Sequence, residues 1–229
     1  MIISINGFEN KIELKEDKVS VLEIEDKKLF NKIIQTLNLK TKGELKEDNE
    51  ILLKDNEEVL DIEKNMIIVF DLFNIEYNNK KYLSKIYEKI SSNIKNSEEY
   101  KIEKLILALR NYLITEVNEL EFEFSMKDDL AIQDILKLFQ VKIDEELYDT
   151  TLEKLEFLIE LISTLGIAKI LIIPNLKSYV DKEEVLELYK YSIYNNIKLL
   201  IIESNKQEDL LKYENKIIID KNFCDFKVD

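Results

Sequence analysis

The apolar residues near the N-terminus are spaced as in short β-strands followed by an amphipathic helix. Runs rich in β-branched residues lie at residues 2–5, 11–14 and 19–24, and such runs are typical of strands. Asp26 is placed to cap a helix over residues 27–38, because its carboxylate can accept from the first free N–H groups. The segment ILLKDNEEVLDI, residues 51–62, predicts a hairpin that turns near Asp55 and Asn56.

Longer apolar runs in the rest of the chain predict strands that are buried on both faces. The buried runs are NMIIVFDLF (65–73) and AKILIIP (168–174). A third run, KLLIIE (198–203), and a fourth, KIIID (216–220), are predicted as the next strand and the last strand. Asp181 and Glu184 predict the start of a helix between the second and third runs, and a short helix is expected near residues 209–212. Strands that alternate with helices at this spacing predict parallel pairing through right-handed crossovers.

Helical periodicity dominates the middle of the chain. One helix is predicted at 80–94, and Asn96 with Glu99 resembles a capping box that opens the next. The apolar stripe of that second helix consists of Ile102, Leu105, Ile106, Leu109, Leu113, Val117 and Leu120. Further helices are predicted over about 128–139 and 145–165, the latter ending at Gly166.

These patterns predict an α/β protein built from both ends of the chain. Residues 1–72 and 146–229 form a head domain with a mostly parallel sheet, and residues 73–145 form an inserted α-helical leg domain. A projection of two or three helices cannot bury every long amphipathic face by itself, so oligomerisation is expected.

The charge of the chain narrows what it can bind. The 229 residues include 33 basic and 47 acidic side chains, giving a formal net charge of −14. This excess argues against nucleic acid, but the distribution of charge matters more than the sum. Arg110 is the only arginine, so bidentate reading of guanine is scarcely available and DNA would be held by its backbone. An A+T-rich genome, which favours lysine codons, also explains the shortage of arginine.

Several absences exclude whole classes of chemistry. The chain has no histidine, which excludes a histidine base, a histidine metal ligand and a Ser-His-Asp triad. None of its three glycines begins a phosphate-binding loop, so ordinary nucleotide hydrolysis is not expected. The single Cys224 cannot form an internal disulfide, and neither a secretory signal nor a membrane-spanning run is visible. A cytoplasmic protein is expected.

The segment NELEFEFSMKDD, residues 118–129, concentrates negative charge. In an extended chain, Glu119, Glu121 and Glu123 share one face, whereas in a helix only Glu119 and Glu123 meet. Asp128 and Asp129 follow near the predicted start of a helix, where the dipole favours negative charge.

Three interpretations of this segment are open. It is a solvated acidic face with ordinary helix capping, or it is a site for calcium, which takes about six to eight oxygen ligands. Zinc and copper are disfavoured because histidine is absent. In the third interpretation the acids, with Asp71 at a strand end, serve a metal-dependent nuclease or NTPase. That interpretation is the least supported, because no companion lysine or pocket motif accompanies the acids.

A loop after the strand ending at Pro174 is a second candidate site. Lys177, Ser178 and Tyr179 follow the carboxyl end of a predicted parallel strand, where α/β folds commonly bind ligands. These residues could contact phosphate, although a turn leading to the cap at Asp181 explains them equally well.

The order of these segments resembles a known family, the ring-forming DNA-end-binding proteins of type II-A CRISPR adaptation. The resemblance runs from MIISINGFENKIEL, VSVLEIEDKKLFNKIIQTL and MIIVFDLFNIEYNNKKYLSKIY through NELEFEF, DILKLFQVKID and TLEKLEFLIELISTL to KILIIPNLKSYVDKEEVLELYKYSIYNNIKLLIIE. It implies a head distantly similar to P-loop ATPases that does not hydrolyse nucleotides, a helical leg and no enzymatic activity. It also implies a calcium-holding homotetrameric ring that binds the ends of double-stranded DNA during spacer acquisition, with the CRISPR integrase complex and the RNA-guided nuclease as partners.

The resemblance also implies particular site residues. The calcium ligands would be Glu119, Glu121, Glu123, Asp128 and Asp129, with Ser125–Lys127 as an apparent insertion between the two groups. No residue would be catalytic. The lysines expected to face DNA in the ring are Lys80, Lys81, Lys101, Lys104 and Lys177.

Overall fold

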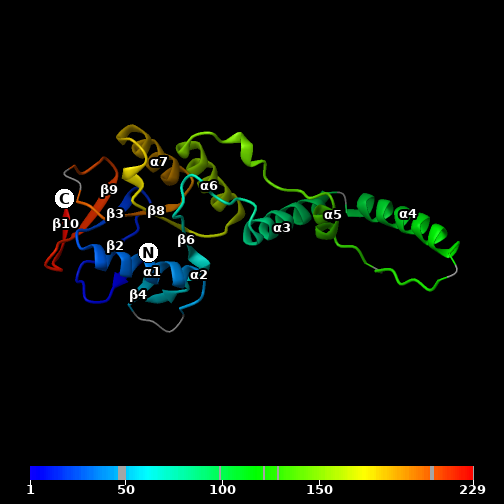
Figure 1. Ribbon diagram of the computed structural model, residues 1–229, viewed down its shortest axis with the longest axis horizontal. Helices are drawn as coiled ribbons and strands as arrows, with labels where there is room; N and C mark the ends of the chain where they lie inside the picture. The colour runs from blue at the N-terminus through cyan, green and yellow to red at the C-terminus, as the bar shows by residue number, and fades with distance from the viewer. Residues whose placement is uncertain (46–49, 98, 121, 128, 207–208, 229) are drawn as a thin grey trace. The chain divides into compact units, whose positions relative to one another are not determined.

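The computed structural model divides the chain into two compact units (Figure 1). It describes residues 1–45, 50–97, 99–120, 122–127, 129–206 and 209–228. The first unit, called the head here, comprises Met1–Ile75 and Glu146–Asp229, and the second, called the leg, comprises Glu76–Glu145. Among the described residues, no helix has the length and apolarity that crossing a bilayer requires.

A six-stranded sheet forms the centre of the head, in the order β10-β9-β3-β8-β7-β6. Its strands are β3 (Val19–Ile24), β6 (Met66–Ile68), β7 (Ile170–Pro174), β8 (Lys198–Glu203), β9 (Glu214–Ile219) and β10 (Asp225–Val228). All neighbours pair in parallel except β9 and β10, which are antiparallel. The predicted parallel pairing is therefore confirmed, and a strand from the N-terminal part lies between two strands from the C-terminal part.

A smaller antiparallel sheet, in the order β2-β1-β4-β5, completes the strands of the N-terminal part. It comprises β1 (Ile2–Ile5), β2 (Ile12–Glu13), β4 (Ile51–Asp55) and β5 (Glu58–Leu60). Asn56 has a positive φ of 54°, a conformation that asparagine tolerates in tight turns. The predicted hairpin is confirmed.

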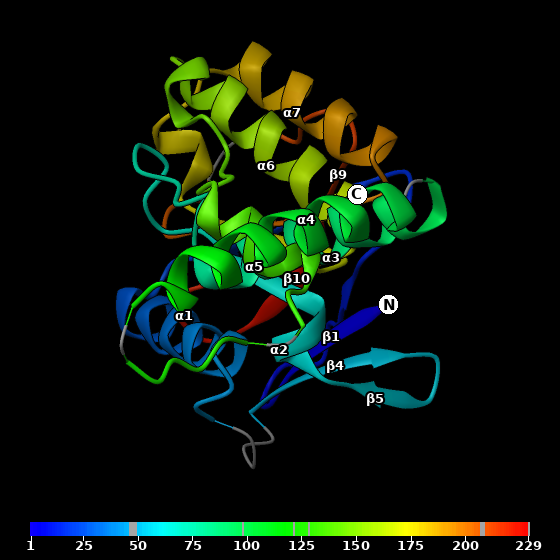
Figure 2. The same ribbon diagram turned by 90° about the vertical axis from the view of Figure 1, so that its right-hand side faces the viewer.

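Helices cover both faces of the six-stranded sheet (Figure 2). One side carries α1 (Lys27–Thr41) with the short α2 (Ile62–Asn65), and the other carries α6 (Thr151–Leu165) and α7 (Lys182–Tyr194). The predicted cap of α1 is present, since Leu29 N donates to Asp26 Oδ1 at 2.8 Å. Because both faces are covered, the central strands are almost fully buried, as expected of parallel sheets.

The leg contains α3 (Lys80–Ser97), α4 (Glu99–Asn118) and α5 (Ile132–Leu138). Its two ends are held together by side chains. Glu145 Oε1 accepts from the backbone N of Tyr77 and of Asn78, both at 3.2 Å. The Asn78 amide donates to Ile143 O at 2.9 Å and accepts from Ile143 N at 2.8 Å. This pairing fixes where the chain enters and leaves the leg.

Two predicted helix starts are wrong, and local capping explains both. The helix expected from about residue 128 begins at Ile132, where the Asp134 carboxylate accepts from Ala131 N. The helix expected from 145 begins at Thr151, after a 3₁₀ turn, η1 (Glu145–Leu147). Thr150 and Glu153 form a reciprocal capping box there, which stops the helix from extending further back.

Three predictions about the strands and their connections also fail. The run 65–73 gives only β6, an edge strand, and Phe70 and Phe73 beyond it are exposed. Residues 209–211 and the turn that follows are not helical. The strand β10 was not predicted, because its pairing depends on a turn in which Asp220 Oδ1 accepts from Asn222 N and Cys224 N.

Candidate functional site

The acidic segment leaves the end of α4 as extended or irregular chain. One last turn continues beyond the helix, with Glu119 N donating to Glu116 O and Leu120 N to Val117 O. Residues 122–127 are not helical, and the rings of Phe122 and Phe124 meet edge to face with centroids 6.4 Å apart. Contact between side chains two residues apart is typical of an extended chain, so the structure supports the extended alternative for residues 122–124.

The proposed calcium ligands are only partly described. Glu119, Glu123 and Asp129 are exposed, and Glu121 and Asp128 lie outside the described residues. Within the described part of the chain, no three acidic, cysteine or histidine side chains gather in a group able to hold a metal ion. The calcium site on these five residues therefore stays a prediction.

The residues around the segment add one carboxylate that the sequence patterns did not single out. Lys127 Nζ lies 2.6 Å from Asp134 Oδ2, and Lys137 Nζ lies 3.8 Å from Asp134 Oδ1. The hydrogen bond from Lys127 lowers the pKa of Asp134. The lysine of the Ser125–Lys127 insertion is thus paired with α5, and Asp134 stays ionised at neutral pH.

Four of the candidate DNA-binding lysines lie exposed on the leg. Lys80 and Lys81 occupy the first turn of α3, where Asn79 Oδ1 accepts from Tyr82 N at 3.0 Å. Basic residues are normally disfavoured there because the dipole already makes that end positive. Lys80 and Lys81 therefore add to the positive charge of this helix end. Lys101 and Lys104 are exposed on α4.

Lys177 lies in a different environment, and the structure contradicts its assignment to a DNA-facing surface. Its side chain is 9% exposed, and its Nζ lies 2.6 Å from Glu214 Oε1. The residue belongs to the 3₁₀ turn η2 (Leu176–Ser178), which follows β7. Burial beside a carboxylate explains why an apparently surface loop lysine points inward.

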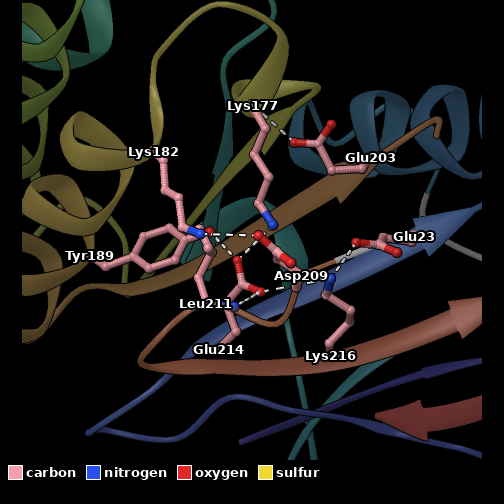
Figure 3. A network of polar contacts seen from close by, with 9 residues as sticks. All are labelled: Glu23, Lys177, Lys182, Tyr189, Glu203, Asp209, Leu211, Glu214 and Lys216. Atoms are coloured by element: carbon pink, nitrogen blue, oxygen red, sulfur yellow. Dashed lines mark hydrogen bonds and ion pairs between the residues drawn. The ribbon is translucent and has the colours of Figure 1, made fainter. Parts of the chain in front are cut away.

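Lys177 is part of a buried network of charges in the head (Figure 3). Lys216 Nζ lies 2.8 Å from Glu23 Oε1 and 3.9 Å from Glu214 Oε2, and it donates to Asp209 O at 2.7 Å. The Tyr189 hydroxyl donates to Glu214 Oε1 at 2.9 Å. Burial and the neighbouring Glu214 raise the pKa of Tyr189 well above its usual value, so it stays a donor.

Glu203 lies at the carboxyl end of β8 in the same network. It is 1% exposed, and its Oε1 accepts from Lys177 N at 3.0 Å. The strand register places it directly beside Glu23 of β3. Burial raises the pKa of Glu203 to about 7, and the charges of Glu23 and Glu214 act in the same direction.

This network extends along one face of the sheet, from Glu214 and Lys216 at the amino end of β9 to Glu23 and Glu203 at the carboxyl ends of β3 and β8. The carboxyl ends of parallel strands are where α/β proteins usually bind ligands. Strand β3 ends at Ile24 and helix α1 begins at Lys27, so only Glu25 and Asp26 lie between them. A phosphate-binding loop needs a longer, glycine-rich connection at that place. The geometry agrees with the absence of such a loop from the sequence.

A family model described as "CRISPR-associated protein (Cas_Csn2)" matches residues 44–223. The chain belongs to the Csn2 family. It is also 26% identical over 225 residues to a "CRISPR-associated protein Csn2" of Enterococcus faecalis, covering 97% of both chains. A protein of the same description from Streptococcus agalactiae is 26% identical over 162 residues, which is 69% of this chain and 70% of that one.

A solved structure supports the fold. The "Crystal structure of Stu0660 of Streptococcus thermophilus" superposes with a TM-score of 0.55 at 14% identity, covering 96% of this chain and 75% of that one. The Csn2-family chain described here thus shares a mixed α/β architecture with a protein of very different sequence.

Asp71, considered above for metal-dependent chemistry, has a structural role in this Csn2-family protein. Its Oδ1 accepts from the backbone N of Phe73 and of Asn74, and its Oδ2 accepts from the Asn74 amide. The hydrogen bond from the Asn74 side chain is the main cause of its lowered pKa. These bonds shape the turn that follows β6, and they give no support to a catalytic role.

The sequence patterns missed the carboxylates and Lys216 of the buried network. A usable signal was present, because Glu23 lies within the predicted strand at 19–24, and Glu203 and Lys216 lie at the ends of the apolar runs at 198–203 and 216–220. A charged residue within such a run requires a buried partner.

Substitutions in the ion pair between Lys216 and Glu23 test whether the buried network stabilises the folded protein. Lys216→Met leaves Glu23 buried without its ammonium partner, so the free energy of unfolding should fall by about 3–5 kcal/mol in urea titrations. The double variant Lys216→Met with Glu23→Leu should lose clearly less, because no uncompensated charge remains at that pair.

The control is Lys64→Met. Lys64 pairs with Asp61 at 3.6 Å on the surface with 79% of its side chain exposed, and such pairs contribute about 0–1 kcal/mol. A Lys216→Met variant no less stable than the Lys64→Met control would contradict the structural role given to the network.

Proposed function

We propose that this Csn2-family protein acts in CRISPR spacer acquisition by binding the ends of double-stranded DNA without sequence preference. It does so as a homotetrameric ring stabilised by calcium, and it catalyses no reaction itself. In this proposal the head is a relative of P-loop ATPases that has lost its phosphate loop. The ring works alongside the CRISPR integrase complex and the RNA-guided nuclease.

The observation that carries the proposal is the exposed apolar surface of helix α4. Large apolar side chains lie around it in contact with solvent in the single chain: Leu105, Leu107, Leu109, Tyr112, Leu113 and Ile114. Leu105 is 70% exposed and Tyr112 is 64% exposed. Exposed apolar areas of this kind mark interaction surfaces, and identical copies are the usual partners in symmetric assemblies.

The acidic segment next to α4 gives calcium a structural use. Leu120, Phe122, Phe124 and Met126 of the segment are exposed, and carboxylates alternate with three of them along the chain. A cation that neutralises the carboxylates lowers the repulsion that opposes burial of this segment in an assembly. Calcium suits the oxygen-only donors here better than zinc or copper would.

The lysines at the start of α3 supply the contact with DNA in this proposal. Lys80 and Lys81 add two positive charges to a helix end that is already positive, and repetition in a ring would multiply this local field. With Arg110 as the only arginine, contacts of this kind are made to phosphates and carry no base sequence. The net charge of −14 does not oppose such a patch, because the field at the DNA is local.

Titration of labelled DNA tests the proposal directly. A linear blunt duplex should bind in calcium, and binding should fall at least tenfold when calcium is chelated. A closed circle of the same sequence should bind at least tenfold more weakly than the linear form, because it offers no end. Equal binding of circle and linear duplex, or no binding in calcium, would contradict the proposal.

A pair of matched double variants tests the lysines. Lys80→Ala with Lys81→Ala should weaken DNA binding about tenfold near physiological salt and make the dependence of affinity on salt less steep. The same change at Lys27 and Lys28, which are also exposed in the first turn of a helix, α1, is the control. If both pairs weaken binding equally, the site on α3 is not specific.

A further inference from the structure

Among the described residues, the charges of the buried network in the head do not balance. Three carboxylates, Glu23, Glu203 and Glu214, share the network with two ammonium groups, Lys177 and Lys216 (Figure 3). Each carboxylate residue is at most 3% exposed. Lys182 and Asp209 at the rim pair with each other at 3.0 Å and are largely exposed, so they add no net charge. With all three carboxylates ionised, the network would hold one excess negative charge.

The distances show which carboxylate carries the excess. Lys216 Nζ is 2.8 Å from Glu23, and Lys177 Nζ is 2.6 Å from Glu214. Glu203 is held instead by a backbone group, the N–H of Lys177. Its neighbour across the strand pair is Glu23, another carboxylate. Two adjacent buried carboxylates cannot both ionise cheaply, and a bound proton is the least costly way to remove the excess charge.

We propose that Glu203 is a proton-linked latch, which holds a proton while the η2 turn is packed on the sheet and loosens that turn when the proton is lost. A neutral Glu203 can still accept the Lys177 N–H with one oxygen, while its hydroxyl is free to donate. The same turn is tied to the end of β8 a second time, since Asn175 Oδ1 accepts from Ser204 N at 2.9 Å. The latch thus acts on residues 175–178.

Burial sets the sign of the pH dependence of Glu203, because it is the largest effect on the pKa of this carboxyl and raises it. Among the neighbouring groups, Lys177 on η2 favours ionisation of Glu203, whereas Glu23 on β3 and Glu214 on β9 disfavour it. The two remaining groups bind the other carboxylates: Tyr189 on α7 donates to Glu214, and Lys216 on β9 pairs with Glu23. The pKa of Glu203 is about 7 in the folded head, against an ordinary glutamate value of 4.5. The proton on Glu203 therefore stabilises the folded head fully when the pH is below the ordinary glutamate pKa of 4.5. This stabilisation is lost as the pH rises through about 7 and does not return above that pH.

Hydrogen exchange followed by mass spectrometry, on the full-length protein between pH 5 and pH 8, tests the latch. After correction for the intrinsic effect of pH, protection of the backbone N–H groups of residues 175–178 should fall by up to tenfold per pH unit until about pH 7 and then level off. The chain has no histidine that would titrate in this range.

Two matched variants test whether Glu203 causes the pH dependence of protection at residues 175–178. In Glu203→Gln, which keeps an acceptor for the Lys177 N–H but cannot titrate, protection of residues 175–178 should not change with pH. Glu187→Gln, on the exposed side of α7, should follow the wild type. A wild-type profile that is flat from pH 5 to pH 8, or a Glu203→Gln profile with the wild-type slope, would overturn the proposal.

A direct titration keeps the proposal testable if Glu203→Gln fails to fold. The side-chain carboxyl carbon of Glu203, followed by NMR in the wild-type protein, should titrate near pH 7. A midpoint near the ordinary glutamate value of 4.5 would overturn the latch.

Discussion

The pairing of β6 with β7 is the constraint on which the rest of the structure depends. Met66 and Ile170 lie opposite each other in parallel strands, although about a hundred residues separate them in the sequence. The chain between them must leave the head and return to the same place, so the leg is an insertion with its two ends together. The bonds of Asn78 and Glu145 to the opposite end of the leg satisfy this requirement within the leg.

The division into two units separates two kinds of surface. In the head, helices cover both sheet faces, and buried charges that bind one another lie between β9 and the carboxyl ends of β3 and β8. In the leg, apolar side chains of α4 and of the acidic segment are exposed. Among the described residues, exposed large apolar side chains therefore make up a larger share of the leg than of the head, and the proposed assembly would bury them.

The elements with strong local signals could be predicted from the sequence. The continuous apolar runs of β7 and β8 and the caps at Asp26 and Asp181 determined those strands and helices within a few residues. Elements that depend on distant partners were missed. Strand β10 exists because β9 offers it an edge, and residues 209–211 are not helical where Lys216 bonds to Asp209 O.

The functional residues also divide into those with a local sequence signal and those whose environment depends on distant parts of the chain. The charge of the segment at 118–129 is visible in the sequence, but a ligand shell that needs a cation and neighbouring copies is not specified by spacing within one chain. Lys177 was predicted to contact phosphate because its loop follows a strand end, and to face DNA because of the family resemblance. It is buried because Glu214, far away in the sequence, lies beneath it.

The most direct measurement is native mass spectrometry of the protein mixed with a short blunt-ended duplex in the presence of calcium. We predict a complex of four protein chains and one duplex, which dissociates when calcium is chelated. A single chain in both conditions, or a tetramer that never carries the duplex, would contradict the account of a calcium-stabilised ring that binds DNA ends.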